Sequence, residues 1–164
     1  MGIWEECNIK LFERSMSILS ELFGRDFQFS LATVNDSKPS IRVVDTYYDN
    51  GKFWIVTYAQ SNKVKEIENN SNVALCNYLY SFKGNAYNMG HPLTEENKEI
   101  RERLIKVFES WYFAHNNEND KDMCYVKIEL TEGFFFKDGK GYRVDFIKKI
   151  VEEFPFAPDA VVIS

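Results

Sequence analysis

The stretch that decides the fold is residues 38–67, KPSIRVVDTYYDNGKFWIVTYAQSNKVKEI. Residues 40–48 and 53–58 are rich in β-branched and aromatic side chains, which predicts two strands. The sequence Asp-Asn-Gly at 49–51 is a strong hairpin signal, because Asn-Gly accepts the positive φ angles that tight hairpin turns need. We therefore expect an antiparallel hairpin, followed by a short helix over 62–69.

The start of this helix carries groups that suit an anion. Ser61 and Asn62 are residue types that cap helices, although caps of this kind are commoner than ligands. Lys63 and Lys65 fall in the first turn, where the helix dipole normally favours acids. Basic side chains and free backbone N–H groups at a helix start suit a phosphate. Thr57 lies at the end of the preceding strand. Either its hydroxyl donates to the same anion, or threonine stands here only because it favours strands.

Arg42 lies on the strand before the hairpin turn, among apolar and hydroxyl-bearing residues. Alternation places it on one face with Ser40 and Val44. An arginine on a half-buried face needs a counter-charge, which is either a carboxylate such as Asp45 or Glu66, or a bound phosphate. The chain holds no GxxxxGK[ST] run, so this constellation is not a P-loop.

Composition excludes several classes of protein. The chain has 164 residues, 45% of them hydrophobic, which is enough for one domain with a substantial core. Twenty Lys and Arg against 25 Asp and Glu give a net charge of −5, so no broad nucleic-acid surface is expected. The odd number of cysteines, Cys7, Cys76 and Cys124, predicts free thiols in a reducing compartment.

Charges at the start of the chain argue against a targeting segment. Glu5, Glu6, Lys10, Glu13 and Arg14 interrupt the region that a signal peptide would need to keep apolar. No apolar run reaches the length of a membrane span. We expect a cytoplasmic protein without a membrane or nucleic-acid partner.

The hydrophobic pattern predicts the remaining elements. In chain order they are a helix over 5–23, strands over 27–34 and 73–80, a short strand near 85–89, a helix after Thr94 that reaches 111, strands over 124–130, 133–137 and 142–146, and a short helix over 147–154. An apolar tail over 155–164 is expected to be docked rather than free. These elements predict a mainly β (α+β) antiparallel barrel with peripheral helices, in a single domain over 1–164 with 147–164 as a C-terminal extension.

Neither histidine identifies a reaction. His91 lies in a Gly-His-Pro turn and is a general acid, a haem ligand or an ordinary loop residue, whereas His115 is explained by a helix C-terminus. The absence of HExxH and GxSxG runs gives no support to a zinc or serine hydrolase, and no metal site is expected. Tyrosines and tryptophan around the hairpin suit a planar ring such as a flavin without selecting one. The catalytic residue stays unknown.

The order and spacing of five segments resemble a known family. These segments are Leu31-Ala32-Thr33, Pro39 to Val44, Asn50 to Thr57, Ser61 to Val64 and Asn72 to Leu75. Over roughly residues 10–130 they look like the pyridoxamine 5'-phosphate oxidase-like FMN-binding split barrels. Within that family, the small nitroimidazole-resistance or general-stress flavoproteins look nearest.

The resemblance implies a six-stranded antiparallel split barrel that forms a homodimer, with FMN at the subunit interface. Carried over by position, the residues that hold the FMN phosphate are Arg42, Lys63, Ser61 and Asn62. The residues that line the ribityl chain and the isoalloxazine ring are Val43, Val44, Val56 and Thr57. Asn85 stands where the family places a polar residue that reaches the flavin from the other subunit.

The activity implied by the resemblance is that of an FMN-dependent oxidoreductase or reductase with small-molecule electron donor and acceptor. Vitamin B6 oxidases of the family carry a basic, Trp-containing C-terminal motif for the substrate phosphate. Here the chain after residue 123 has Arg143 as its only arginine and no Trp, so pyridoxamine phosphate is not the expected substrate. Two alternatives stay open: a sensor that binds flavin, or haem through His91, without turnover, and an interaction domain without cofactor.

Overall fold

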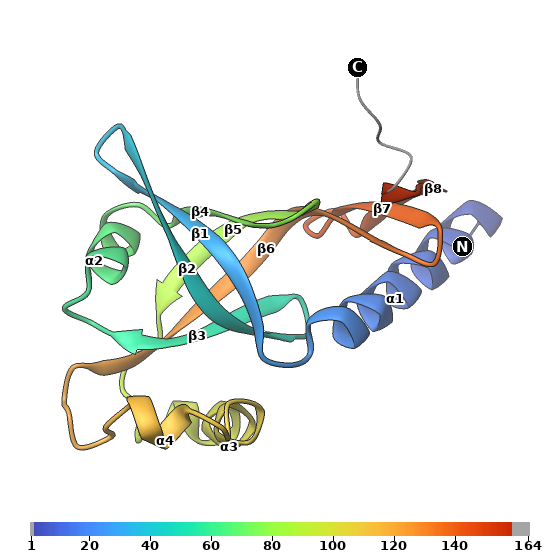
Figure 1. Ribbon diagram of the computed structural model, residues 1–164. Coiled ribbons are helices and arrows are strands. Elements are labelled where there is room, and N and C mark those ends of the chain that lie inside the picture. The colour runs from blue at the N-terminus through green and yellow to red at the C-terminus, as the bar shows by residue number, and fades with distance from the viewer. Residues whose placement is uncertain (1, 159–164) are drawn as a thin grey trace.

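The structure is a computed structural model that describes residues 2–158 (Figure 1). Its elements are α1 (Ile3–Phe23), β1 (Phe27–Asn35), β2 (Lys38–Asp49), β3 (Lys52–Tyr58), α2 (Asn62–Asn69), β4 (Asn72–Asn77), β5 (Tyr80–Asn88), the 3₁₀ turn η1 (Glu95–Asn97), α3 (Lys98–Val107), α4 (Tyr112–His115), β6 (Met123–Lys137), β7 (Lys140–Asp145) and β8 (Ile150–Pro155). The predicted end of the tail, 159–164, lies outside the described residues.

Six of the strands close into an antiparallel barrel. Their order is β3-β2-β1-β4-β5-β6, and pairing of β3 with β6 completes the ring. That closing pair runs in register from Lys52 opposite Glu129 to Tyr58 opposite Met123. β7 and β8 continue the sheet beyond the C-terminal half of β6. The predicted mainly β fold with a six-stranded antiparallel barrel is confirmed.

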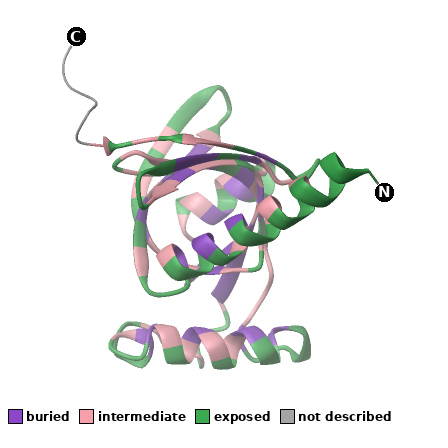
Figure 2. Ribbon diagram, turned by 90° about the vertical axis from the view of Figure 1, so that its right-hand side faces the viewer, coloured by how far each residue is buried: buried purple, intermediate pink, exposed green. Residues whose placement is uncertain are grey.

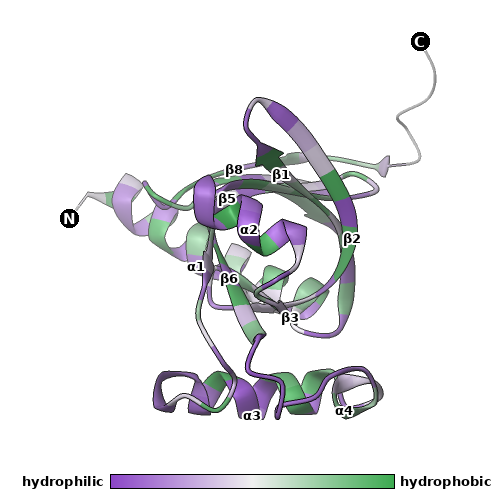
Figure 3. Ribbon diagram, turned by 90° about the vertical axis from the view of Figure 1, so that its left-hand side faces the viewer, coloured by the Kyte–Doolittle hydropathy of each residue, from purple (hydrophilic) through white to green (hydrophobic). Residues whose placement is uncertain are grey.

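The predicted hairpin and the helix after it are also confirmed. Asn50 and Gly51 take the positive φ angles of 48° and 80° that the turn requires. β2 pairs with β3 only from Tyr47 to Asp49, whereas it pairs with β1 from Lys38 to Thr46. Residues 40–46 of β2 therefore separate from β3, and α2 lies across this end of the barrel (Figure 3).

The barrel interior is filled by aromatic rings and closed at its other end by α1. Figure 2 shows the buried face of α1 turned toward the inside of the barrel. Phe23 of this helix lies 5.4, 5.9 and 5.7 Å, between ring centroids, from Phe29, Phe53 and Phe82. Tilted and edge-on pairs of this kind add to the free energy of burying the rings. α1 therefore completes the core.

A second apolar cluster fixes α3 and α4 on the outside of the barrel. Ile100, Leu104, Phe108 and Tyr112 of this helical segment pack against Trp54, Met123 and Tyr125 of β3 and β6. The helix predicted up to residue 111 is shorter than expected, because α3 ends at Val107 and a turn precedes α4. The apolar spacing continues through that turn, so periodicity alone did not reveal the break.

The predicted helix over 147–154 is wrong. The Asp145 carboxylate accepts the backbone N–H groups of Ile147 and Lys148 at 3.0 and 2.9 Å, which makes a turn. The chain then returns as β8, paired with β7. The apolar residues of this segment have helical spacing, but they are divided between a turn and a strand. The segment forms a strand because β7 offers an edge with which it can pair.

Two further strand predictions are corrected. The predicted strand over 73–80 is interrupted by a turn at Tyr78, which has a φ of 50°, so β4 and β5 form a hairpin and β5 starts well before residue 85. The strands predicted over 124–130 and 133–137 are one continuous strand, β6. A Cβ at Gly133 would lie 2.8 Å from Cε1 of Phe82, so only glycine lets β6 pass the core here.

Phe53→Ala tests the aromatic core. Phe53 is fully buried and its ring lies within 6 Å of four other aromatic rings. We expect the free energy of unfolding, measured by urea denaturation, to fall by about 3–5 kcal/mol because a cavity replaces the ring. The matched control is Phe113→Ala, since Phe113 is 60% exposed. Equal losses in both variants would contradict this core.

Candidate functional site

Arg42 and Lys63, the two cations predicted to bind phosphate, lie close together where β2 separates from β3. Arg42 points inward from β2, as the predicted alternation requires, and Lys63 lies in the first turn of α2. Burial lowers the pKa of Lys63, and the positive charge of Arg42 lowers it further. The two cations therefore share one partly desolvated environment, which raises the local affinity for an anion.

The guanidinium of Arg42 is engaged within the protein. Its Nη2 donates to Ser40 Oγ at 2.8 Å and to Glu66 Oε2 at 3.0 Å. Its Nη1 donates to Thr33 Oγ1 and, at 3.5 Å, to the carbonyl of Leu31. Of the two counter-charges left open by the sequence, a carboxylate or a phosphate, the structure contains the carboxylate, and it is Glu66.

Glu66 is tied into the same network. Its Oε2 also accepts the Thr33 hydroxyl, and its side chain is 11% exposed. Hydrogen bonding to Thr33 lowers its pKa most, and Arg42 and Ser40 add to the effect against the opposing influence of burial. The other predicted carboxylate, Asp45, is not the partner of Arg42 and accepts the Gln28 amide at 3.0 Å instead.

Lys63, in contrast to Arg42, has no carboxylate partner among the described residues. None of the ion pairs among residues 2–158 involves Lys63. A half-buried ammonium beside a guanidinium is unfavourable in the ligand-free protein. It becomes favourable when an anion lies next to it.

Ser61 provides a second sign of a ligand at this place. It occupies the N-cap position of α2 with an extended backbone, but its hydroxyl makes no capping hydrogen bond. Ser61 Oγ is buried and has no hydrogen-bond partner among the described residues. Buried polar atoms are nearly always hydrogen-bonded, because an unpaired one costs free energy. A phosphate at the start of α2 would satisfy this hydroxyl and the free N–H groups of the first turn.

The remaining predicted site residues differ in their burial and in the side of the sheet that they face. Val43 points out of the barrel and is 63% exposed, whereas Val44 points into the core and is 6% exposed. Val56 is half-buried, and Asn62 is exposed at the first position of α2. Thr57 is buried opposite Cys124, whose thiol also lies near Lys63. Thr57 therefore belongs with the cations, while Val43 and Val44 face opposite sides of the sheet.

Asn85 is not part of this cluster within one chain. It lies on β5, and β1 and β4 separate that strand from β2 and Arg42. Its Oδ1 accepts a hydrogen bond from Ser71 at 3.1 Å. The contact from Asn85 of a second subunit to a ligand at α2 stays a prediction.

Sequence reasoning missed the roles of Thr33 and Ser40. Both side chains bond to Arg42, and Thr33 links it to Glu66. The signal was present, because alternation puts Thr33 on the inner face of β1 and Ser40 on the inner face of β2. Hydroxyls on a face that is otherwise apolar indicate a buried polar network.

The surroundings of His91 give little support to a role as a general acid or a haem ligand. The Nδ1 of His91 accepts the backbone N–H of Leu93 at 3.1 Å, and its Nε2 lies 3.1 Å from the carbonyl of Asp120. Both ring nitrogens are therefore engaged in holding the loop before α3. Within residues 2–158, no three His, Cys, Asp or Glu side chains gather as a metal site would require.

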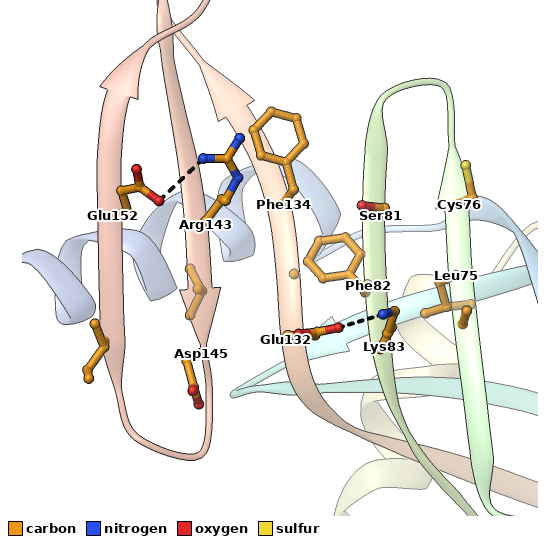
Figure 4. A pocket seen from close by; sticks show the side chains of 14 residues that line it. Leu75, Cys76, Ser81, Phe82, Lys83, Glu132, Phe134, Arg143, Asp145 and Glu152 are labelled. Atoms are coloured by element: carbon orange, nitrogen blue, oxygen red, sulfur yellow. Dashed lines mark hydrogen bonds and ion pairs between the residues drawn. The ribbon is translucent and has the colours of Figure 1, made fainter.

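A concavity of 610 Å³ lies elsewhere, on the outer face of β4 to β8 (Figure 4). None of the predicted site residues lines it. Four of its charged side chains form two ion pairs, Lys83 with Glu132 at 2.8 Å and Arg143 with Glu152 at 3.3 Å. The carboxylate of Asp145, which also lines it, accepts the backbone N–H groups of the turn after β7. Because these charges are already compensated and exposed, the cluster at α2 is the better candidate for an anion site.

Comparison with protein families agrees with this fold. Residues 19–137 match the family model described as pyridoxamine 5'-phosphate oxidase. The match covers well over half of the chain, so the protein belongs to this family. A search of curated proteins by sequence gave no match. Across the described residues, no helix is both long and apolar enough to cross a membrane.

Several solved structures share the fold at low sequence identity. General Stress Protein 26 from Bacillus anthracis is 20% identical, with a TM-score of 0.54 over 73% of this chain and 91% of that one. A NimC/NimA family protein from Clostridium acetobutylicum is 20% identical, with a TM-score of 0.53 over 88% and 93%. A pyridoxamine 5'-phosphate oxidase-related, FMN binding protein from Nostoc punctiforme is 11% identical, with a TM-score of 0.52 over 96% and 98%.

Lys63→Met tests the electrostatic strain of the ligand-free site. Because the folded state lowers the pKa of Lys63, its charge destabilises the protein fully below that lowered pKa, and the penalty decreases as the pH rises from there toward the ordinary pKa of lysine. We expect the variant to raise the thermal unfolding midpoint at neutral pH, by a few degrees at most. This gain should shrink as the pH rises and the native amine loses its proton.

The matched control is Lys65→Met, which removes the same charge from an exposed position on the same helix. Its unfolding midpoint should stay at the wild-type value. A destabilised Lys63→Met protein in the absence of any ligand would contradict the strained-cation interpretation.

Proposed function

We propose that this protein binds FMN and is an FMN-dependent oxidoreductase. The observation that carries the proposal is the buried Ser61 hydroxyl at the start of α2, which has no partner in the described part of the chain, near the half-buried Lys63 ammonium. A phosphate satisfies both groups at once. Support for FMN in particular comes from membership of the family and from the Nostoc punctiforme protein of the same fold, which is described as FMN binding.

The residues of this chain then have distinct tasks. Lys63 and Ser61 hold the phosphate together with the backbone N–H groups of Asn62 and Lys63. Arg42 contributes its charge from β2, and Thr57 adds a hydroxyl beside them. The exposed Val43 and the half-buried Val56 provide apolar surface for the rest of the cofactor, whereas Val44 contributes through its backbone because its side chain lies in the core.

The bound flavin supplies the capacity for hydride or electron transfer. The protein binds and orients it, and small molecules serve as electron donor and acceptor. We assign no catalytic residue, since no described acid or base beside Arg42, Ser61 and Lys63 is distinguished as a proton donor or acceptor for the reaction. Reduction of the bound flavin by NADH or NADPH, followed by reoxidation with an added acceptor, is the test for turnover. A bound flavin that no donor reduces would favour a sensing protein.

Pyridoxamine phosphate is not the substrate that we propose. Arg143, the only arginine of the C-terminal part, lies on β7 outside the barrel and pairs with Glu152. Its guanidinium also lies 4.5 Å from the centre of the Phe154 ring. An arginine committed to these contacts is a poor counterpart of the basic substrate-binding motif found in vitamin B6 oxidases.

We further propose a homodimer with the cofactor at the interface between subunits. Ile41 and Val43 are 71% and 63% exposed on the outer face of β2. The neighbouring outward position on β1 is Ala32, which lies opposite Ile41 and Ala74 in register. The exposed Ile41 and Val43 with the half-buried Ala32 and Ala74 beside them make an apolar surface that favours association, and a second copy of the chain would bury it.

A cytoplasmic location completes the proposal. Cys7 and Cys76 are exposed free thiols, and Cys124 is a buried one. Exposed thiols without disulfide partners are usual in a reducing compartment.

Flavin binding is tested with the purified protein by its visible spectrum and by titration with FMN and riboflavin. We expect Lys63→Met to weaken FMN binding by about tenfold or more, because a desolvated charge-assisted contact is lost. Riboflavin lacks the phosphate, so its affinity should not change. Lys65→Met is the control and should bind FMN as the wild type does. Absence of flavin bands together with no binding of added FMN would refute the proposal.

The dimer is tested by light scattering after size-exclusion chromatography. Ile41→Glu should shift the mass toward that of the 19.3 kDa chain, because it places a charge in the proposed apolar interface. Ile147→Glu is the matched control, since Ile147 is 74% exposed in the turn between β7 and β8. A dimer that withstands Ile41→Glu, or a wild type that is already a monomer, would contradict the proposed interface.

A further inference from the structure

The carboxylate of Glu66 sits where an anionic ligand would be expected to meet Arg42. Both terminal nitrogens of Arg42 are used inside the protein, Nη2 by Ser40 and Glu66 and Nη1 by Thr33 and the Leu31 carbonyl. An arginine that holds a phosphate normally uses two parallel N–H groups. A phosphate therefore reaches Arg42 in that way only if part of this network is released.

The charges at the site indicate which of the hydrogen bonds of Arg42 a phosphate would release. Arg42 and Lys63 contribute two positive charges, and Glu66, three residues after Lys63 on α2, contributes one negative charge. The side chains of Arg42 and Glu66 are only 23% and 11% exposed, so solvent screens them little. A phosphate brought to this place meets the attraction of two cations and the repulsion of one carboxylate. Ser40 and Thr33 are uncharged and do not repel the phosphate.

On the basis of the proposed function, we propose that Glu66 is an internal anion that holds Arg42 in the ligand-free protein and is displaced from it by the ligand's phosphate. Glu66 thereby sets how strongly the site prefers a phosphorylated ligand over its unphosphorylated form. Thr33 makes the exchange feasible, because its hydroxyl remains a partner for Glu66 after Arg42 has turned to the phosphate. Lys63 and Ser61 receive the anion directly.

Glu66→Gln removes the negative charge and keeps the shape and hydrogen-bonding capacity of the side chain. We expect the ratio of riboflavin to FMN dissociation constants, measured by flavin fluorescence titration, to increase by roughly tenfold over the wild type. Riboflavin affinity itself should stay unchanged. Glu66→Ala, which removes both the charge and the hydrogen-bonding group, should change the ratio in the same direction if the charge is the cause.

Glu68→Gln is the matched control. It removes the same charge from the same helix, from an exposed side chain that accepts a hydrogen bond from Asn88 at 3.0 Å. The ratio in this variant should equal that of the wild type. A ratio that is unchanged or lower in Glu66→Gln and Glu66→Ala would overturn the proposal, and a lower ratio would make Glu66 a residue that orients Arg42 for the phosphate.

Inorganic phosphate separates this proposal from the flavin proposal. Thermal unfolding in increasing concentrations of phosphate, at constant ionic strength, should show a larger stabilisation of Glu66→Gln than of the wild type and Glu68→Gln. If the wild type binds neither FMN nor riboflavin, the proposed function fails, yet the phosphate measurement still decides the role of Glu66. Equal stabilisation of all three proteins would overturn that role even in a protein that binds FMN.

Discussion

Pairing of β3 with β6 is the interaction on which the rest of the structure depends. It closes the barrel, so the apolar faces of six strands enclose one aromatic core instead of forming an open sheet. Closure removes two sheet edges that would otherwise need protection. It also forces β3 to follow β6 while β2 follows β1. The two strands of the strongest hairpin in the chain therefore separate after only three residue pairs.

The candidate site is a consequence of that separation. Where β2 and β3 part, the edge of β2 has no strand partner, and α2 packs across this end of the barrel against β1 and β5. This brings Lys63 and Glu66 of the helix to Arg42 of the strand. A short helix thus serves two purposes, since it covers one end of the core through Val64 and Ile67 and presents its uncapped N-terminus beside two cations.

The elements that could be predicted from the sequence are those that local chemistry specifies. α1, the hairpin at Asn50-Gly51 and α2 each carry their own periodicity, turn or cap signal, and the structure contains them as expected. β8 and the turn between β4 and β5 were mispredicted, because they depend on an available strand edge and on an unusual φ at Tyr78. Local patterns contain neither kind of information.

By itself, the sequence determined the mainly β barrel, the inward direction of Arg42 and the start of α2 at Ser61, because alternation and helix propensity act over a few neighbouring residues. Only the tertiary structure decided that Glu66, and not Asp45, neutralises Arg42. It alone left the Ser61 hydroxyl buried without a partner among residues 2–158. The physical reason is that desolvation and ion pairing depend on distances between residues far apart in the chain, which barrel closure sets.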